Sequence, residues 1–536
     1  MQLIKEISQN KLRGGFYTPK SIASFILKWA FNGNKNLDIL EPSCGDGVFL
    51  TEIQKGNYKY NSVTAIEFDK IEANKSRKIG LEKTKIINAD FNEFCINTDN
   101  HFDLIIGNPP YIRYQYFDKT QQEYASKIFD KAELKYSKLT NSWVSFVVGS
   151  SLLLKDNGKI GFVIPAEILQ VSYAKPLRIF LAKFYNKINI ISFEKLVFPG
   201  IQQEVVLLLC EKNESSSHLI EHLELRDAEE LKNLDVAKLK SPKKNIDFKS
   251  NKWTFYFLEQ NEIDFLERLQ IEQIIPKFGN YAKVEVGITT GSNPFFTVPH
   301  STVKSYDLEQ YAKPLVGRSV QVSSSIFTID DWNKNVTNEA RTHLLTFPNM
   351  TEIKKSTRAC EYIELGESQN IHKGYKCGIR EEWQIVPSLR ISDALFIRRN
   401  NLYPKLIINE AQAYTTDTMH RVTVKPNAEI KALTASYYNS ISLVFSEICG
   451  RSHGGGVLEL MPNEVEEILL PYNENNASLL PLIDKMIREK NDISEVLKIT
   501  NEKILKDNFG FSDYEINLAD SIWKKLSKRR LNRGKK

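Results

Sequence analysis

Four consecutive residues, Asn108-Pro-Pro-Tyr111, have the chemistry needed to activate an amino nitrogen. An adenine-type amino group delocalises its lone pair into the ring. It therefore reacts only when acceptors hold its hydrogens while positive charge develops in the transition state. The Asn108 side-chain oxygen and the Pro109 carbonyl oxygen can be those acceptors. Pro109 and Pro110 fix the backbone, and Tyr111 can stack on the base. Asn-Pro turns alone are common, but the whole tetrapeptide after a buried strand is far more specific.

A glycine loop lies upstream, where an apolar run leads into Glu41-Pro-Ser-Cys-Gly-Asp-Gly47. Gly45 and Gly47 permit a tight turn and a close approach of the backbone to a ligand. Glu41 and Asp46 would repel a pyrophosphate but attract cations. S-adenosylmethionine carries a sulfonium and an ammonium group and no phosphate. The loop therefore predicts a site for this cofactor, formed by Glu41, Ser43, Cys44, Gly45, Asp46 and Gly47.

Acids also end the next two predicted strands. Glu67 follows the second strand and can accept hydrogen bonds from both ribose hydroxyls of the cofactor. Asp90 follows the third and can accept from the adenine amino group, while Phe91 covers the ring. A single loop carboxylate is usually only solvated. Three successive strands that each end in an acid favour one shared ligand.

Short apolar runs alternate with amphipathic stretches over the first 210 residues, and this alternation predicts a mainly parallel sheet with helices on both faces. The predicted strands are Leu37–Leu40, Val63–Ile66, Lys85–Ile87, Leu104–Ile106, Ile160–Ile164, Ile188–Phe193 and Val205–Leu209. The predicted helices are Ser21–Trp29, Val48–Gln54, Asp69–Lys78, Trp143–Leu154 and Pro176–Phe184.

The composition changes after Cys210, which predicts a division into domains. Residues 1–212 form the expected catalytic domain, and residues 213–250, polar and partly basic, form a boundary region. Residues 251–475 have short, mixed patterns rich in Gly, Pro and Asn, typical of an α+β domain. Residues 476–536 are predicted to be helical in two pieces, with a break near Asn508–Gly510.

The catalytic half resembles the gamma-class amino-methyltransferases of DNA, whose motifs occur here in the same order. That resemblance implies a Rossmann-like methyltransferase domain with a seven-stranded sheet, followed by a C-terminal target-recognition domain. Gly15-Phe-Tyr-Thr-Pro19 resembles the family's opening motif, so Tyr17 and Thr18 are expected at the cofactor. By the same resemblance Phe146 lies against the cofactor's adenine, and Phe198 stacks on a base flipped out of the duplex. Weaker similarities to the recognition domain are Gly287–Gly291, Pro314–Arg318 and Gly450–Val457.

Composition is that of a folded intracellular protein. Of the 536 residues 42% are hydrophobic, and the six cysteines lie far apart, with no pattern for disulfides or zinc. Neither a signal peptide nor a membrane-spanning stretch is recognisable, so we expect a cytoplasmic protein that does not bind membranes. The net charge of +6 permits nucleic-acid binding. Residues 521–536 carry eight Lys or Arg and no acid, which fits either a phosphate-contacting arm or a frayed, solubilising end.

Several short patterns point elsewhere and are set aside. His218-Leu-Ile-Glu-His222 spells a zinc-protease pattern but has no evident third ligand, and no metal is expected. Asn293-Pro-Phe-Phe296 echoes the tetrapeptide without its second proline and is interpreted as a turn. The glycines of Gly454–Gly456 suggest a close backbone approach rather than a phosphate cradle. A cytosine-C5 enzyme would need a Pro-Cys nucleophile, and that dipeptide does not occur.

These observations favour a site-specific methyltransferase acting on the N6 amino group of adenine in double-stranded DNA. It would be a monomer, the modification half of a restriction–modification system whose endonuclease acts on the same site without a stable complex. Three alternatives remain open: an RNA or protein-glutamine N-methyltransferase, a catalytically inactive specificity subunit, and cytosine N4 as the accepting atom. We do not expect a fused nuclease, because fewer than twenty residues precede the first motif and the segment after the recognition domain is too short for one.

Overall fold

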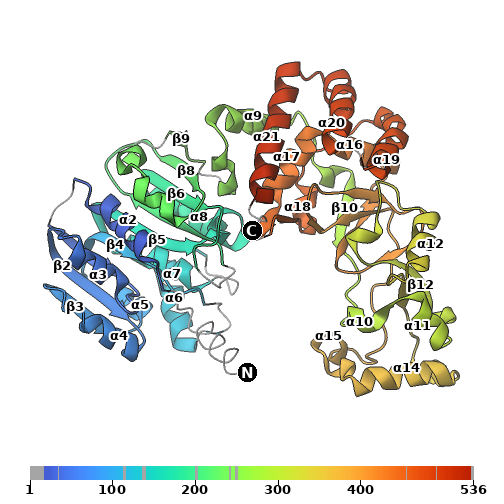
Figure 1. Cartoon of the computed structure of the whole chain (residues 1–536), viewed down its shortest axis with the longest axis horizontal. Coiled ribbons are helices and arrows are strands. Elements are labelled where there is room, and N and C mark those ends of the chain that lie inside the picture. The colour runs from blue at the N-terminus through green and yellow to red at the C-terminus, as the bar shows by residue number, and fades with distance from the viewer. Residues whose placement is uncertain are drawn as a thin grey trace. The chain divides into compact units, whose positions relative to one another are not determined.

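The protein divides into two compact units, Met1–Ile263 (unit 1) and Asp264–Lys536 (unit 2), whose elements are labelled in Figure 1. Helix α9 (Gln260–Ile271) spans the division. The computed structural model describes residues 17–33, 36–112, 116, 118–135, 141–198, 203–240, 243–247, 252–453, 455–490 and 492–532. Within these ranges, none of the helices is both long enough and apolar enough to cross a membrane.

Unit 1 is built on a nine-stranded sheet in the order β3-β2-β1-β4-β5-β7-β6-β8-β9. Its strands are β1 (Leu37–Glu41), β2 (Tyr60–Glu67), β3 (Thr84–Asn88), β4 (Phe102–Gly107), β5 (Leu154–Pro165), β6 (Lys187–Phe193), β7 (Val205–Glu211), β8 (Leu219–Leu225) and β9 (Lys244–Asn245). Strands β1 to β5 pair in parallel, and β7 is antiparallel to both of its neighbours. The predicted mainly parallel sheet is confirmed.

Two strands were not expected, so the sheet is larger than the seven strands predicted. β8 and the two-residue β9 lie in segment 213–250, which had been predicted to be a boundary region. β8 pairs in parallel with β6 over seven residues. The polar, Ser-rich approach to β8 concealed the strand, and β8 itself mixes apolar residues with Glu221, His222 and Glu224, so it lacks the continuous apolar run of a central strand.

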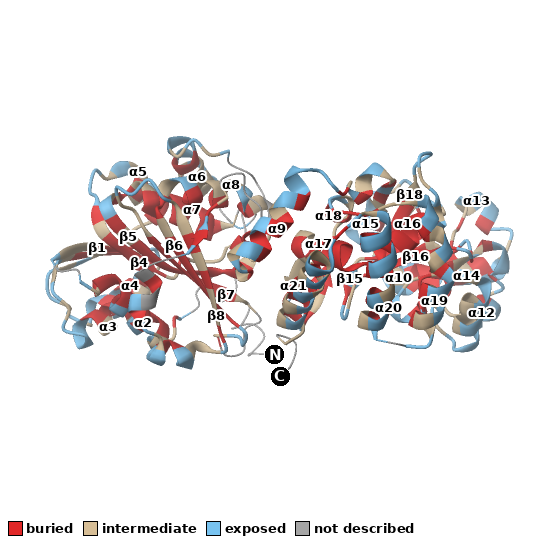
Figure 2. Ribbon diagram, turned by 90° about the horizontal axis from the view of Figure 1, so that it is seen from above, coloured by how far each residue is buried: buried red, intermediate tan, exposed pale blue. Residues whose placement is uncertain are grey.

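Helices cover both faces of this sheet. Figure 2 shows α2, α3 and α4 on one face and α5, α6, α7 and α8 on the other. They are α2 (Lys20–Phe31), α3 (Val48–Lys55), α4 (Lys70–Arg77), α5 (Phe91–Asn97), α6 (Lys119–Lys131), α7 (Ser142–Leu152) and α8 (Lys175–Phe184). The five predicted helices are found within two residues of their predicted ends, and only α5 and α6 were missed.

The central strands are buried on both faces. Their neighbours on either side hold them in place, and with them the point at which the chain leaves the sheet. Leu104, Ile105 and Ile106 of β4 are fully buried, as Figure 2 shows for the strands around β4. Such continuous apolar runs are typical of parallel strands covered by helices on both sides. β4 is paired to β1 on one side and β5 on the other, so the residues that follow it leave the sheet at a fixed point.

Unit 2 is an α+β unit with three small sheets, ordered β10-β18-β14-β16, β11-β13-β12-β17 and β15-β20-β19. Its strands are β10 (Ala282–Val286), β11 (Thr297–Val298), β12 (Ala312–Val316), β13 (His343–Leu345), β14 (Ala394–Ile397), β15 (Arg399–Asn400), β16 (Leu406–Ile408), β17 (Tyr414–Thr415), β18 (Met419–Val424), β19 (Arg451–His453) and β20 (Val457–Glu459). Its helices include α10 (Asn293–Phe296), α11 (His300–Ser305), α12 (Ile329–Thr337), α13 (Met350–Ile353), α14 (Thr357–Ser368), α15 (Tyr375–Gly378), α16 (Ile430–Tyr437), α17 (Ser440–Cys449) and α18 (Pro462–Glu466).

The C-terminal segment is helical, as predicted, and the described part of its basic stretch belongs to a helix that extends to Asn532. The helices are α19 (Leu480–Arg488), α20 (Ile493–Thr500), which continues as a π-helical segment to Asn508, and α21 (Asp513–Asn532). Arg530 near the end of α21 is only 1% exposed and forms an ion pair with Glu447 of α17. This residue therefore holds α21 against α17 and is not available to a phosphate. Residues 533–536 lie outside the described residues.

Candidate active site

A cavity of about 430 Å³, here called the acidic cavity, lies at the carboxyl ends of β1, β2, β3 and β4. This is the edge at which open parallel sheets bind ligands. Of the predicted cofactor residues, those that line it are Tyr17, Thr18, Glu41, Ser43, Cys44, Gly45, Asp46, Glu67, Asp90, Phe91 and Phe146. Asn108 and Pro110 of the tetrapeptide line the same cavity. Six carboxylates and no Lys or Arg are among its described lining residues.

Glu41 is the most deeply buried of these acids, with 2% of its surface exposed. Its Oε2 atom has no hydrogen-bond partner among the described residues. Burial, and then the neighbouring Glu67 and Asp46 carboxylates, hold the Glu41 pKa well above its ordinary value. A buried carboxylate without a partner is costly. A cationic ligand that reached Glu41 would remove that cost.

Glu67 is held in place by the loop that follows β1. Its Oε2 accepts from the Gly45 backbone N–H at 2.8 Å, and its Oε1 accepts from the Asp69 N–H at 2.8 Å. Burial nevertheless raises the Glu67 pKa. Each carboxylate oxygen can accept a second hydrogen bond. Glu67 can therefore still take the two hydroxyl donors of a ribose.

Gly47 has a packing role that the sequence did not indicate, and its contact with the cofactor stays a prediction. Its φ is +87°, and it does not line the acidic cavity. A Cβ at this position would lie 2.3 Å from Ile79 Cδ1 and 2.9 Å from Ser76 Oγ. The glycine thus lets α3 start close to the segment around α4. Gly45, at φ +54°, has open space around a Cβ and does face the cavity.

Asp90 accepts hydrogen bonds from two residues that were not predicted from the sequence as its partners. It is the N-cap of α5, where Oδ1 accepts from the Glu93 N–H at 3.1 Å. Its Oδ2 accepts from Gln121 Nε2 at 3.2 Å. Gln121 lies in the first turn of α6 and also lines the cavity. No sequence signal could have found Gln121, because only the docking of α6 on α5 brings it to Asp90.

Aromatic rings form the other wall of the acidic cavity. The Phe91 and Phe146 rings lie 4.8 Å apart between centroids, so these two predicted residues are brought together. Phe68, directly after Glu67, also lines the cavity and is 67% exposed. Phe68 was not predicted from the sequence, although its position directly after a strand that ends in an acid could have indicated it. An exposed aromatic ring at a cavity mouth can cover the flat face of a ligand.

The tetrapeptide Asn108–Tyr111 is anchored by hydrogen bonds on both sides. Ser43 Oγ donates to the Asn108 carbonyl oxygen at 3.2 Å. At the other end Ser142 Oγ donates to the Pro110 carbonyl oxygen, and Ser142 Oγ accepts from the Ile112 N–H at 2.8 Å. The segment after β4 therefore has little freedom. Such fixed placement is what an acceptor pair needs in order to act without reorganising.

Tyr111 is tied to the Asn108 side chain. Its hydroxyl lies 2.8 Å from Asn108 Oδ1 and 3.1 Å from the Val163 carbonyl oxygen. One hydroxyl proton can serve only one of these two acceptors at a time. Burial holds the Tyr111 pKa well above its ordinary value, so the proton stays on the oxygen.

Three predicted catalytic residues do not line the acidic cavity. Pro109 is buried, Tyr111 is partly buried, and Phe198 is 2% exposed within the core of unit 1. Tyr111 packs against that same core. The expectation that Tyr111 and Phe198 stack on a target base stays a prediction, and for Phe198 it requires the side chain to leave the core. Part of its segment, Pro199, lies outside the described residues, as do Gly15 and Phe16 of the opening motif.

Cys44 is not a nucleophile in this arrangement. It is buried, and its thiol donates to Ser76 Oγ at 3.5 Å. Burial and the nearby Glu41 raise the pKa of the thiol far above its ordinary value. A thiolate is required for nucleophilic attack, so this cysteine is inert at neutral pH.

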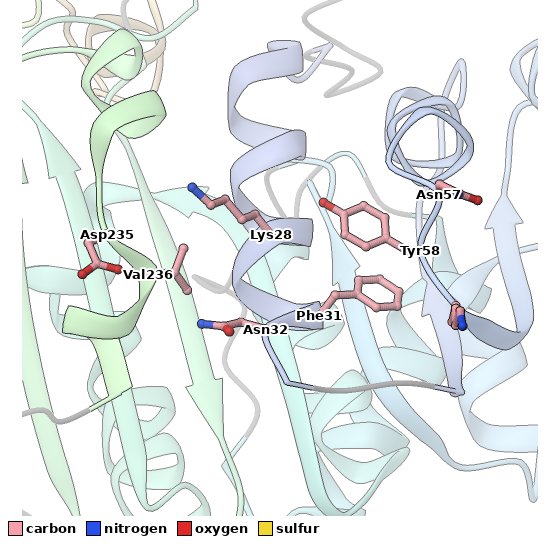
Figure 3. A pocket seen from close by; sticks show the side chains of 8 residues that line it. Lys28, Phe31, Asn32, Asn57, Tyr58, Asp235 and Val236 are labelled. Atoms are coloured by element: carbon pink, nitrogen blue, oxygen red, sulfur yellow. The ribbon is translucent and has the colours of Figure 1, made fainter.

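A second cavity, of about 380 Å³, lies at the opposite end of the sheet (Figure 3). It is bordered by the C-terminal end of α2 and the residues before β2, where the Phe31 and Tyr58 rings stack at 4.3 Å. Asp235 is the only acid among its described lining residues. It holds none of the predicted site residues and stands at the amino ends of strands, so it is not the candidate active site.

The patterns that were set aside have structural roles. His218 and His222 belong to the start of β8 and its approach, an extended segment, so they cannot share a helix face as the zinc pattern requires. Asn293-Pro-Phe-Phe296 forms the short helix α10, not just a turn, with Phe295 and Phe296 in the core. Gly456 approaches the end of α21 closely, as expected, and Gly454 lies outside the described residues.

The state of Glu41 gives a testable stability effect. Its pKa is raised in the folded state above the ordinary 4.5, so above pH 4.5 this carboxyl group binds more protons in the folded protein than in the unfolded chain. The contribution of Glu41 to stability must then fall as pH rises through that window. We expect Glu41→Gln to be more stable than the wild type at pH 8, by about 1–3 kcal/mol, with the difference shrinking toward pH 4. Thermal melting across this pH range measures it.

Glu82→Gln is the matched control, because Glu82 is exposed beside β3. This variant should melt like the wild type at every pH. Equal pH dependence of Glu41→Gln and the wild type would contradict the assignment of Glu41 as an uncompensated buried acid.

Both parts of the chain match known protein families. Residues 19–198 match the family described as Eco57I restriction-modification methylase. Residues 250–505 match the C-terminal domain of the Type II methyltransferase M.Eco57I.

Individual relatives agree with these families. The chain is 26% identical over 518 residues to the Type II methyltransferase M.AccI of Acinetobacter calcoaceticus, covering 89% of this chain and 93% of that protein. It is 29% identical over 276 residues to the Type II methyltransferase M.HincII of Haemophilus influenzae, covering 50% and 49%. Among solved structures, a nuclease-deletion mutant of the Type ISP restriction-modification enzyme LlaGI in complex with a DNA substrate mimic is 14% identical, with a TM-score of 0.49 over 88% of this chain and 55% of that one.

Proposed function

We propose that this chain, which belongs to the gamma-class type II methyltransferases of restriction–modification systems, transfers a methyl group from S-adenosylmethionine to the N6 amino group of adenine in DNA. The observation that carries the proposal is one of position. An acceptor-bearing Asn108 and a set of cation-attracting carboxylates line the same cavity. An amino nitrogen and a cationic methyl donor would meet there.

The residues present fit S-adenosylmethionine. Bound there, it supplies a methyl group on a sulfonium, which is transferred to a nucleophile. The buried Glu41 carboxylate, with its unpartnered Oε2, suits a positively charged group. Glu67 suits the ribose hydroxyls, and the Phe91, Phe146 and Phe68 rings suit the flat adenine. Thr18, which is buried and lines the same cavity, suits the methionine end.

The tetrapeptide residues would activate the target nitrogen. Asn108 Oδ1 and the Pro109 carbonyl oxygen accept the two amino hydrogens, which favours the tetrahedral, positively charged nitrogen of the transition state. Tyr111 now donates to Asn108 Oδ1, but the Val163 carbonyl oxygen lies 3.1 Å from the same hydroxyl. Tyr111 can therefore turn its proton to Val163 and leave the Asn108 oxygen to the substrate. A base in a duplex must first be flipped out to reach these acceptors.

Adenine in DNA is favoured over the other planar nitrogens for two reasons. The tetrapeptide begins with Asn, whereas cytosine-N4 members of the resembled family usually begin it with Ser. Unit 2 adds more than 270 residues beside a complete catalytic unit, and residues 250–505 match a domain of a type II methyltransferase. A separate unit of this size suits the recognition of a DNA sequence better than the modification of a single protein side chain. We assign target choice to unit 2, on duplex DNA bound by a monomer, with a cognate endonuclease that acts on the same site separately.

Product analysis tests the proposal directly. The protein is incubated with methyl-labelled S-adenosylmethionine and plasmid DNA, and the digested nucleosides are separated. We expect label only in N6-methyladenine, at one recurring sequence. Label in N4-methylcytosine would overturn the choice of base. Label that appears only when RNA or protein is supplied, and not with DNA, would overturn the choice of substrate.

A further inference from the structure

The smallest sheet of unit 2 carries a basic face. It consists of β15, β20 and β19 in that order. In its register Arg399 lies opposite Glu459, and Glu459 lies opposite Arg451. Residues directly opposite one another in antiparallel strands point to the same face. His453, two residues beyond Arg451, points there as well. Two arginines and a histidine therefore share one face of the sheet with a single acid.

The charges in this cluster do not balance. Glu459 Oε1 accepts from Arg398 Nε at 3.0 Å and from Arg399 Nε at 3.1 Å. Arg451 Nε donates to Glu464 Oε1 at 3.0 Å. Three guanidinium groups thus meet two carboxylates, both of which are buried. The cluster keeps at least one positive charge in excess.

Two of the arginines are held in place by a single nitrogen each, which leaves their other nitrogens available to a ligand. Arg399 and Arg451 donate only through Nε within the described part of the chain, so their terminal nitrogens make no hydrogen bond there. The Arg399 side chain is 67% exposed. A guanidinium fixed at Nε presents its terminal N–H groups in a set direction, and this fork fits the oxygens of a phosphate. Arg530 is the opposite case, because all three of its nitrogens donate to protein atoms.

The hairpin that carries Arg451 is itself anchored. Between β19 and β20 the chain passes Gly456, which has φ +75°. The Gly456 carbonyl oxygen accepts from Arg530 Nη1 at 2.5 Å, and a Cβ on Gly456 would lie 3.3 Å from the α21 backbone. α21 therefore fixes the hairpin, and little freedom would be lost when a ligand binds its face.

We propose that Arg399 and Arg451 form a clamp for a phosphate of the DNA backbone. The proposal rests on the proposed function, which supplies the DNA. Phosphate contacts add affinity and set the register of a protein on the duplex without reading its sequence. The sequence alone had suggested such phosphate contacts only for the basic C-terminal segment.

Salt dependence of DNA binding tests the clamp. Arg399→Gln removes the exposed arginine and leaves Glu459 with Arg398 and His453, so the fold is kept. Binding to a random-sequence duplex is measured between about 50 and 200 mM salt, a range over which affinity that depends on phosphate contacts falls steeply. We expect the slope of log affinity against log salt to flatten by roughly 0.9, the value for one lost contact. The methylated sequence and the cofactor affinity should not change.

Arg358→Gln is the matched control. Arg358 is an exposed arginine on α14 of the same unit, likewise paired with a glutamate, Glu361. It should leave the salt slope unchanged.

Each outcome separates the clamp from the proposed function. A slope unchanged in Arg399→Gln, with normal DNA binding and methylation by the wild type, overturns the clamp alone. An equal flattening in both variants assigns the effect to net charge and also overturns it. A changed methylated sequence would mean that Arg399 contacts a base. A wild type that neither binds nor methylates DNA overturns the proposed function and the clamp together.

Discussion

Asn108→Ala is expected to lower the rate of methyl transfer by roughly 10²–10³-fold, the loss typical when one preorganised transition-state partner is removed. Asn108 lines the acidic cavity, and its Oδ1, which now accepts from the Tyr111 hydroxyl, is the proposed acceptor of an amino hydrogen. Alanine keeps the backbone anchors from Ser43 and Ser142, so the loop should stay in place. Single-turnover kinetics with saturating DNA and cofactor measure the chemical step, and calorimetry checks that cofactor binding is kept.

Asn293→Ala is the matched control for this loss. Asn293 opens the only other Asn-Pro dipeptide in the sequence, but it lies in unit 2, where its side chain hydrogen-bonds to Thr290 and Asp417. Its variant should retain the transfer rate of the wild type. If Asn108→Ala keeps its rate, or if it fails only because cofactor binding is lost, the acceptor role of Asn108 is wrong.

Arg530→Met is expected to destabilise unit 2 by about 3–5 kcal/mol, the usual cost of leaving one member of a buried ion pair alone. Arg530 Nη2 and Nε both reach the Glu447 carboxylate, at 2.7 and 2.9 Å, and both side chains are almost fully buried. Methionine fills a similar length but leaves Glu447 charged without a partner. Urea unfolding measures the change, followed by a probe within unit 2 such as the buried Trp523.

Two further variants identify the cause. Lys528→Met removes an exposed cation from the same helix and should change stability by no more than about 0.5 kcal/mol. The double variant Arg530→Met with Glu447→Met removes both charges and should recover part of the loss. Full recovery is not expected, because Arg530 also donates to the carbonyl oxygens of Gly456 and Leu402. An Arg530→Met protein of wild-type stability but weakened DNA binding would restore the phosphate-arm interpretation.

Much of unit 1 could be predicted because its signals are local. The three acids predicted to bind the cofactor, Glu41, Glu67 and Asp90, lie at the end of a strand or within two residues of it, so they are identified by their distance from an apolar run. Parallel strands buried on both faces have continuous apolar runs, and their carboxyl ends meet at one edge of the sheet. The sequence by itself thus determined seven of the nine strands, the order of the motifs and the expectation that they converge.

What only the tertiary structure decided depends on residues far apart in the chain. Gln121 reaches Asp90 across 31 residues because α6 packs on α5. A side chain at Gly47 would clash with Ser76 and Ile79, and Arg530 forms an ion pair with Glu447, 83 residues away. A charged or flexible residue has the same local pattern whether it faces solvent, a ligand or another helix. Its role is fixed by the partner that packing brings to it, and no run of neighbouring residues contains that partner.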